Sequence, residues 1–149
     1  MKFFPFVLVL VLIISSCSKK NSQSEIDDQI IKNYLTSKQL TATKDVSGLY
    51  YIMTLTGTGA SPVATSTVEV KYKGTLINGN VFDQTATNTT YSHALSGLIK
   101  GWQIGIPLMK VGGKATFLVP SELGYGGNDL GVIPPNSVLI FDIELISIK

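Results

Sequence analysis

From residue 48 to its C-terminus, the chain has the periodicity of short β-strands and contains only one short helical segment. Residues 67–73 alternate strictly between polar and apolar side chains, as a strand with one buried face does. Residues 138–148 place Leu139, Phe141, Ile143 and Leu145 on one face. The helical candidate at 98–106 is too short to be stable without tertiary packing. We therefore expect an α+β fold in which a twisted, mostly antiparallel sheet of about five or six strands wraps around one short helix.

The first residues have the order of a bacterial export signal. Lys2 is followed by an uncharged apolar run at 3–14, which is shorter than the roughly 20 residues that a membrane-spanning helix needs. The run ends in Ile14-Ser15-Ser16-Cys17, which resembles a lipobox. The resemblance implies a lipoprotein signal peptide at 1–16, cleavage before Cys17 and lipidation of that cysteine. An ordinary cleaved signal followed by an incidental cysteine is the alternative.

Residues 17–47 are expected to link the lipidated Cys17 to the domain at 48–149. A polar tether comes first, and Ser24 can cap a helix at 25–38. Apolar residues recur along that helix at three- and four-residue spacing, as an amphipathic helix requires: Ile26, Ile30, Ile31, Tyr34 and Leu35. The helix could be a spacer that packs on the domain or on a sister chain, or a dimerisation helix. Residues 40–47 are expected to form a polar link.

The composition excludes several classes of function. All 12 positive side chains are lysines and the net charge is only +2, so no guanidinium forks or basic cluster are available for nucleic acid. The single cysteine and the single histidine, His93, cannot form a disulfide or a zinc finger. His93 is expected to be a structural residue. No phosphate-binding loop, GxSxG or HExxH motif occurs, so any enzyme chemistry here needs neither a nucleophile nor a metal.

Aromatic and apolar residues with few polar ones recur in ordered blocks. The blocks lie at 70–76, 78–83, 98–102, 105–109, 123–126, 132–136 and 139–145. In this order and spacing they resemble FKBP-type peptidyl-prolyl cis-trans isomerases, and the similarity covers residues 66–149. The resemblance implies an FKBP-like fold with a hydrophobic pocket between the sheet and the short helix.

The resemblance also implies which residues form that pocket. The catalytic residues would be Asp83, Tyr125, Trp102 and Phe82, and the substrate-binding residues would be Tyr72, Tyr91, Ile99, Val132, Ile133 and Phe141. The indole of Trp102 would form the floor under the proline ring, and Val132 and Ile133 would cover one rim. The Tyr125 hydroxyl and the Ile99 N–H would donate to substrate carbonyls. His93 stands where many family members have an aromatic residue, and the loop at 125–132 is shorter than is usual in the family.

The expected activity is isomerisation of X–Pro bonds in exported proteins, without a cofactor, metal or covalent intermediate. The expected partners are proline-containing unfolded or exported polypeptides, the membrane through the lipid on Cys17, and macrolides as candidate ligands. The expected location is the cell envelope, on the periplasmic side or at the outer membrane. The alternative is a module without catalysis that uses the same pocket to bind proline-containing segments as a chaperone.

Overall fold

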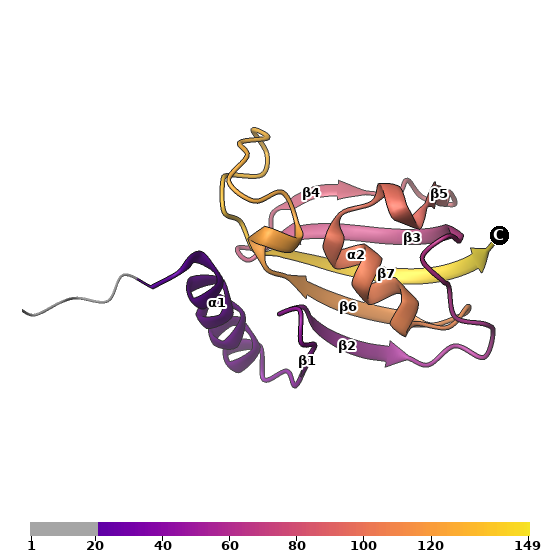
Figure 1. Ribbon diagram of the computed structural model, residues 1–149, viewed down its shortest axis with the longest axis horizontal. Coiled ribbons are helices and arrows are strands. Elements are labelled where there is room, and N and C mark those ends of the chain that lie inside the picture. The colour runs from indigo at the N-terminus through magenta and orange to yellow at the C-terminus, as the bar shows by residue number, and fades with distance from the viewer. Residues whose placement is uncertain (1–20) are drawn as a thin grey trace, which may run out of the picture.

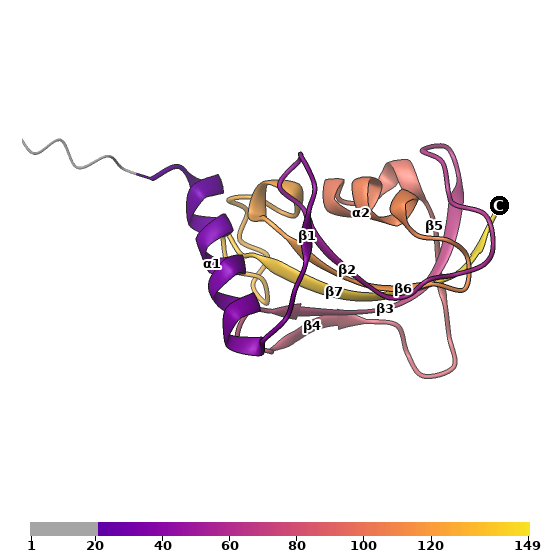
Figure 2. The same ribbon diagram turned by 90° about the horizontal axis from the view of Figure 1, so that it is seen from below.

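The computed structural model describes residues 21–149 as a curved antiparallel sheet with one short helix in its concavity and a longer helix at one end (Figures 1 and 2). Neither of these helices is both long and apolar enough to cross a bilayer. The predicted signal peptide and the predicted lipidation site at Cys17 lie outside the described residues.

The sheet has seven strands, and every pairing is antiparallel. Its order is β1 (Thr43–Lys44), β2 (Tyr50–Leu55), β6 (Lys114–Val119), β7 (Leu139–Ile148), β3 (Thr67–Leu76) and β4 (Val81–Gln84), with β5 (Tyr91–Ala94) also paired to β3. The predicted fold class is confirmed, but the predicted strand number is too low. The strand β1 lies inside the segment expected to be a polar link, and two residues are too few to show a period.

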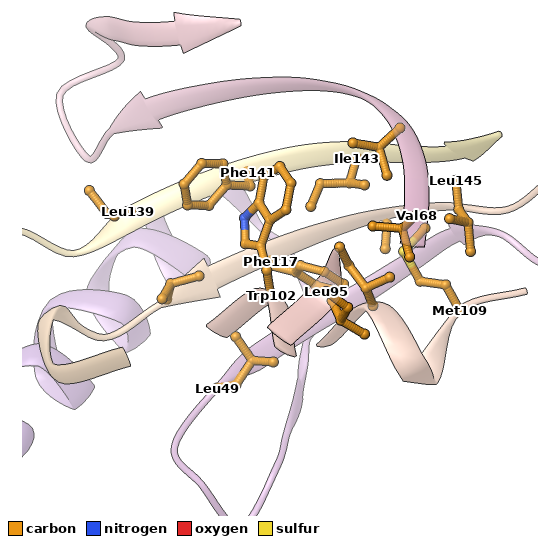
Figure 3. Packing of buried hydrophobic residues seen from close by; sticks show 14 of the residues in the cluster. Leu49, Val68, Leu95, Trp102, Met109, Phe117, Leu139, Phe141, Ile143 and Leu145 are labelled. Atoms are coloured by element: carbon orange, nitrogen blue, oxygen red, sulfur yellow. The ribbon is translucent and has the colours of Figure 1, made fainter. Parts of the chain in front are cut away.

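The concave face of the sheet carries the main hydrophobic core (Figure 3). The helix α2 (Lys100–Gly105) lies over β6 because two of its residues lack side chains. A Cβ on Gly101 would lie 2.6 Å from Val119, and one on Gly105 would lie 2.7 Å from the buried Phe117 ring. These close contacts bring Trp102, also in α2, down onto the sheet.

Three short 3-10 helices connect these elements. They are η1 (Leu95–Gly97) before α2, η2 (Ile106–Leu108) after it, and η3 (Ser121–Leu123) after β6. Helix α2 is shorter than the predicted span of 98–106, because its first two predicted residues are extended and its last turn tightens into η2, which contains Pro107.

Helix α1 (Gln23–Lys38) begins two residues earlier than predicted and has a different cap. The Ser22 side chain accepts from the Glu25 N–H at 3.3 Å, and the Glu25 carboxylate accepts from the Ser22 N–H at 2.9 Å. This reciprocal capping box needs a Glu or Gln three residues after the cap, which Ser22 has and Ser24 does not.

Helix α1 packs on the opposite face of the sheet from α2, at the end where β6 stops. Its buried residues Ile31 and Leu35 join a second small core with Tyr50, Leu118 and Ile140. Its contact with its own domain agrees with the spacer interpretation, while a role in dimerisation stays a prediction.

One buried carboxylate fixes the position of α1. Asp27 is fully buried, and its Oδ2 accepts from the Ser121 N–H at 2.8 Å and from the Ser121 hydroxyl at 2.7 Å. The other oxygen accepts from the Gln23 amide at 2.7 Å. An acidic residue near a helix N-terminus usually faces solvent and interacts with the helix dipole, whereas Asp27 is a buried acceptor that joins α1 to the segment after β6.

A second carboxylate, that of Asp28, attaches α1 to the domain, and its contacts predict that the stability of the fold falls in acid. Asp28 accepts from Lys32 at 2.7 Å, from Lys44 at 2.5 Å and from the Tyr50 hydroxyl at 2.6 Å. These bonds, that of Lys32 first, hold the pKa of Asp28 well below its ordinary value of 3.8. Because the folded state favours the carboxylate, this contribution to stability is present above about pH 4 and is lost as the pH falls below that value.

We expect Asp28→Asn to lower the free energy of unfolding at about pH 7 and to have a smaller effect at about pH 2. Urea denaturation of both proteins at several pH values measures this difference. A difference that stays constant over this range would show that Asp28 is not linked to folding in this way.

Candidate active site

A concavity of about 190 Å³ opens between the start of α2 and the strands β3, β4, β5 and β7. Aromatic and aliphatic side chains form most of its wall, and one carboxylate lies at its edge. The lining residues are Tyr72, Asp83, Tyr91, Leu98, Ile99, Trp102, Tyr125 and Phe141.

Trp102 lies at the base of this concavity, in edge-to-face contact with two rings. Its ring centroid is 5.1 Å from that of Tyr72 at 81°, and 5.2 Å from that of Phe141 at 86°. Figure 3 shows the indole nitrogen on the side toward Phe141. This nitrogen is buried and has no hydrogen-bond partner within residues 21–149. The two edge-to-face contacts hold the indole from both sides, so the floor of the concavity is an aromatic ring of fixed orientation.

The polar edge of the concavity is formed by two hydroxyls and one carboxylate. The Tyr72 hydroxyl donates to Asp83 Oδ2 at 2.5 Å. Burial, and then this hydrogen bond, raise the pKa of Tyr72. Burial, and then the charge of Asp83, raise the pKa of Tyr125. A phenol is neutral at physiological pH even at its ordinary pKa, and these upward shifts keep both hydroxyls protonated over a wider pH range.

The backbone of β3 explains how these groups meet. Alternation along the strand points Tyr72 and Gly74 to the concave face, and Asp83 pairs directly opposite Gly74. The missing side chain at Gly74 leaves room for Phe82, whose ring would lie 2.6 Å from a Cβ there. The register shifts between Gly74 and Thr75, so a bulge locally re-aims the β4 side chains.

Seven of the ten residues predicted for the pocket meet at this concavity. They are Tyr72, Asp83, Tyr91, Ile99, Trp102, Tyr125 and Phe141. Phe82, Val132 and Ile133 are not among the lining residues. The Phe82 ring packs edge-on against Phe141, with the centroids 5.5 Å apart, and so supports the wall from behind.

The predicted rim at Val132 and Ile133 has a different arrangement. Ile133 is only 5% exposed and belongs to the main core, whereas Val132 is 68% exposed. The chain bends at residues 131–133, where the Val132 N–H donates to the Leu130 carbonyl at 2.9 Å, so the two side chains leave the backbone toward different surroundings and do not share one rim. Leu98 also lines the concavity but was not predicted to do so. It directly precedes Ile99, and only the three-dimensional path of the chain into α2 shows that its side chain reaches the concavity.

His93 lies beside the concavity rather than in it. Its ring stacks on Tyr91 with centroids 5.8 Å apart, and its Nδ1 lies 2.8 Å from the Ala94 carbonyl oxygen. It is exposed, and it packs over Gly97. His93 therefore backs one wall of the site through Tyr91.

The other face of the sheet has a wider hollow of about 350 Å³. Lysines, threonines and acidic residues of β2, β3, β6 and β7 line it, and only Tyr72 among the pocket aromatics contributes to it.

Among residues 21–149, no three His, Cys, Asp or Glu side chains come together in a way that could hold a metal ion. The aromatic concavity itself offers a defined shape, walls of low polarity and a few polar groups at its edge.

Comparison with known proteins agrees with this geometry. The sequence profile of the FKBP-type peptidyl-prolyl cis-trans isomerase family matches residues 59–146. Over 104 residues, 69% of this chain, the FKBP-type isomerases FkpA of Aeromonas hydrophila and of Escherichia coli strain K12 are 45% and 44% identical to it. The matched part is only 39% and 38% of those relatives, so the chain spans well under half of their length.

Solved structures resemble the chain as well. The crystal structure of FkpA from Escherichia coli superposes with a TM-score of 0.75 at 36% identity, covering 85% of this chain and 63% of that one. A peptidyl-prolyl cis-trans isomerase from Pseudomonas syringae has a TM-score of 0.73 at 27% identity, covering 88% of this chain and 99% of that one. The expected fold is thus confirmed by both comparisons.

Proposed function

Because the chain belongs to the FKBP-type peptidyl-prolyl cis-trans isomerase family, we propose that it catalyses cis-trans isomerisation of X–Pro bonds in polypeptides. The observation that carries the proposal is the concavity floored by Trp102, which is closed by rings and has the Tyr72 and Tyr125 hydroxyls and Asp83 at its edge. Such a site suits a pyrrolidine ring flanked by two peptide groups.

The low polarity of this site favours the reaction. Rotation about an amide is slow because its C–N bond has partial double-bond character, with a barrier of about 18–20 kcal/mol. In the twisted transition state resonance is lost, and the amide is less polar than in either planar ground state. A pocket of aromatic rings therefore stabilises the twisted amide relative to the planar forms, which water solvates better. Each 1.4 kcal/mol of such preference raises the rate about tenfold.

The edge groups have a different role. The Tyr125 hydroxyl can donate to a substrate carbonyl, and burial, which raises its pKa further above the physiological range, keeps it protonated. Asp83 holds the Tyr72 hydroxyl and so fixes the wall beside Trp102. Holding the flanking peptide while the prolyl bond turns converts binding energy into orientation. No covalent intermediate is needed.

We further propose that the substrates are exported proteins and that a lipid on Cys17 tethers the domain to a membrane of the cell envelope. The lipobox-like sequence before Cys17 supports this, and two or more acyl chains give firm attachment. Tethering raises the local concentration of the isomerase near chains that emerge at the membrane.

We also propose macrolides as ligands of the pocket, since one relative, 45% identical over 103 residues, is named FK506-binding protein 4.

Exchange NMR on a short peptide with one X–Pro bond tests the activity. Uncatalysed exchange takes tens to hundreds of seconds, so catalytic amounts of the protein should produce cis-trans exchange cross-peaks that are absent without it. Peptide binding that shifts the Trp102 indole resonance without faster exchange would contradict catalysis and support the binding module. Neither binding nor exchange with several different residues before proline would contradict both functions.

A further inference from the structure

The side chain of Gln103 holds the turn that leads into the concavity. Its Nε2 donates to the Leu98 carbonyl at 2.6 Å and, less closely, to the Ser96 carbonyl at 3.3 Å. Gln103 lies in α2, one residue after Trp102, but is not among the residues that line the concavity. Its amide therefore acts on the site only through the backbone of the preceding turn.

The Leu98 carbonyl shares a peptide group with the Ile99 N–H. In a trans peptide the C=O and the N–H point in opposite directions, so the bond from Gln103 to the carbonyl also fixes the direction of the N–H. The next carbonyl, that of Ile99, accepts from the Trp102 N–H at 3.0 Å and from the Gln103 N–H at 3.1 Å. Both peptide groups that flank Ile99 are thus held by residues of α2.

The Ile99 N–H itself has no acceptor among residues 21–149. Leu98 and Ile99 both line the concavity, so the peptide group that joins them lies at its edge. A hydrogen bond accepted by a peptide carbonyl also polarises the N–H of the same peptide and strengthens the bond that this N–H donates by about 10–30%. The bond from Gln103 therefore both orients the Ile99 N–H and makes it a better donor.

We infer that Gln103 is a positioning residue that holds the Leu98–Ile99 peptide so that its N–H binds a carbonyl of the substrate. The inference rests on the proposed isomerase function and adds a residue outside the pocket to its machinery. Without the Gln103 amide, the turn keeps the weaker bond from the Leu98 N–H to the Leu95 carbonyl, at 3.2 Å. The peptide could then rotate, and the N–H would point at the substrate for only part of the time.

The test compares Gln103→Met and Gln103→Glu with wild type in an isomerisation assay that separates KM from kcat. Both variants keep the length of the side chain and remove its donor. Because the N–H binds the substrate carbonyl in the planar and twisted states alike, KM should rise about threefold to tenfold while kcat stays nearly constant. The matched control is Gln29→Met on the exposed face of α1, where Gln29 donates to Asn33 at 2.9 Å, and it should change neither constant.

The chemical shift of the Ile99 amide proton, measured by backbone NMR, would not depend on Gln103 if that residue served only the stability of the domain. On peptide binding, the Ile99 amide proton should shift downfield in wild type and clearly less in the Gln103 variants, while the Trp102 indole proton responds in all of them. An unchanged KM and an unchanged Ile99 shift in folded variants would overturn the inference. A fall in kcat with constant KM would overturn it as well. If wild type itself does not accelerate exchange, the proposed function fails, and the Ile99 shift on peptide binding still decides whether Gln103 positions the donor.

Discussion

Replacing Asp83 by alanine is expected to lower kcat/KM for X–Pro isomerisation about tenfold to a hundredfold while the domain stays folded. Asp83 accepts the Tyr72 hydroxyl at 2.5 Å and lies on an exposed edge of the concavity. Its loss frees the ring that packs edge-on against Trp102 and removes the negative charge that polarises the pocket mouth. A hydrogen bond to a charged group contributes about 1.5–3 kcal/mol, which sets the size of the effect.

The control for Asp83→Ala is a chemically matched change on the other face of the sheet. Asp142 is also exposed and accepts a hydroxyl, that of Thr116, at 2.6 Å. Asp142→Ala should leave the rate unchanged. Tyr72→Phe should lower the rate by itself, and adding it to Asp83→Ala should cost little more, because both changes remove the same bond. An Asp83→Ala protein as active as Asp142→Ala would place the chemistry elsewhere.

Replacing Phe117 by alanine is expected to lower the free energy of unfolding by about 3–5 kcal/mol. The ring is fully buried and pairs across the sheet with Phe141. It also fills the space that Gly105 leaves open under α2, as the 2.7 Å approach shows. The helix has only six residues and cannot close over the resulting cavity without moving Trp102. Urea denaturation followed by Trp102 fluorescence measures both the stability and the environment of the indole.

Phe82→Ala is the matched comparison for stability, because it removes the same atoms from a half-buried position. Its cost should be clearly smaller than that of Phe117→Ala, since solvent can occupy part of the space. Equal losses in the two variants would mean that the core under α2 relaxes around the missing ring. That result would contradict the rigid support for the pocket floor.

The sequence by itself determined the elements whose residues bury one face at a regular period. The alternating strand predicted at 67–73 lies entirely within β3. The four apolar residues predicted on one face of the last strand are all buried, from Leu139 to Leu145. Local side-chain periodicity is sufficient for such elements, because a strand that buries one face must alternate.

Motif order also predicted most of the site. The resemblance placed Tyr72, Trp102 and Phe141 around one pocket, and these rings do meet there. This prediction depended on the ordered series of family motifs, because the three residues belong to different elements and are far apart in the sequence. Nothing in the spacing of a single block would have brought them together.

Only the tertiary structure decided which side of a segment faces the site. Ile133 turns into the core while its neighbour Val132 stays in solvent, and Phe82 packs behind Phe141. Asp27 becomes a buried acceptor because the backbone of Ser121, distant in the sequence, comes to lie against α1. Such placements depend on contacts between elements that pack against each other. The periodicity of a sequence shows only which residues of one element share its buried face.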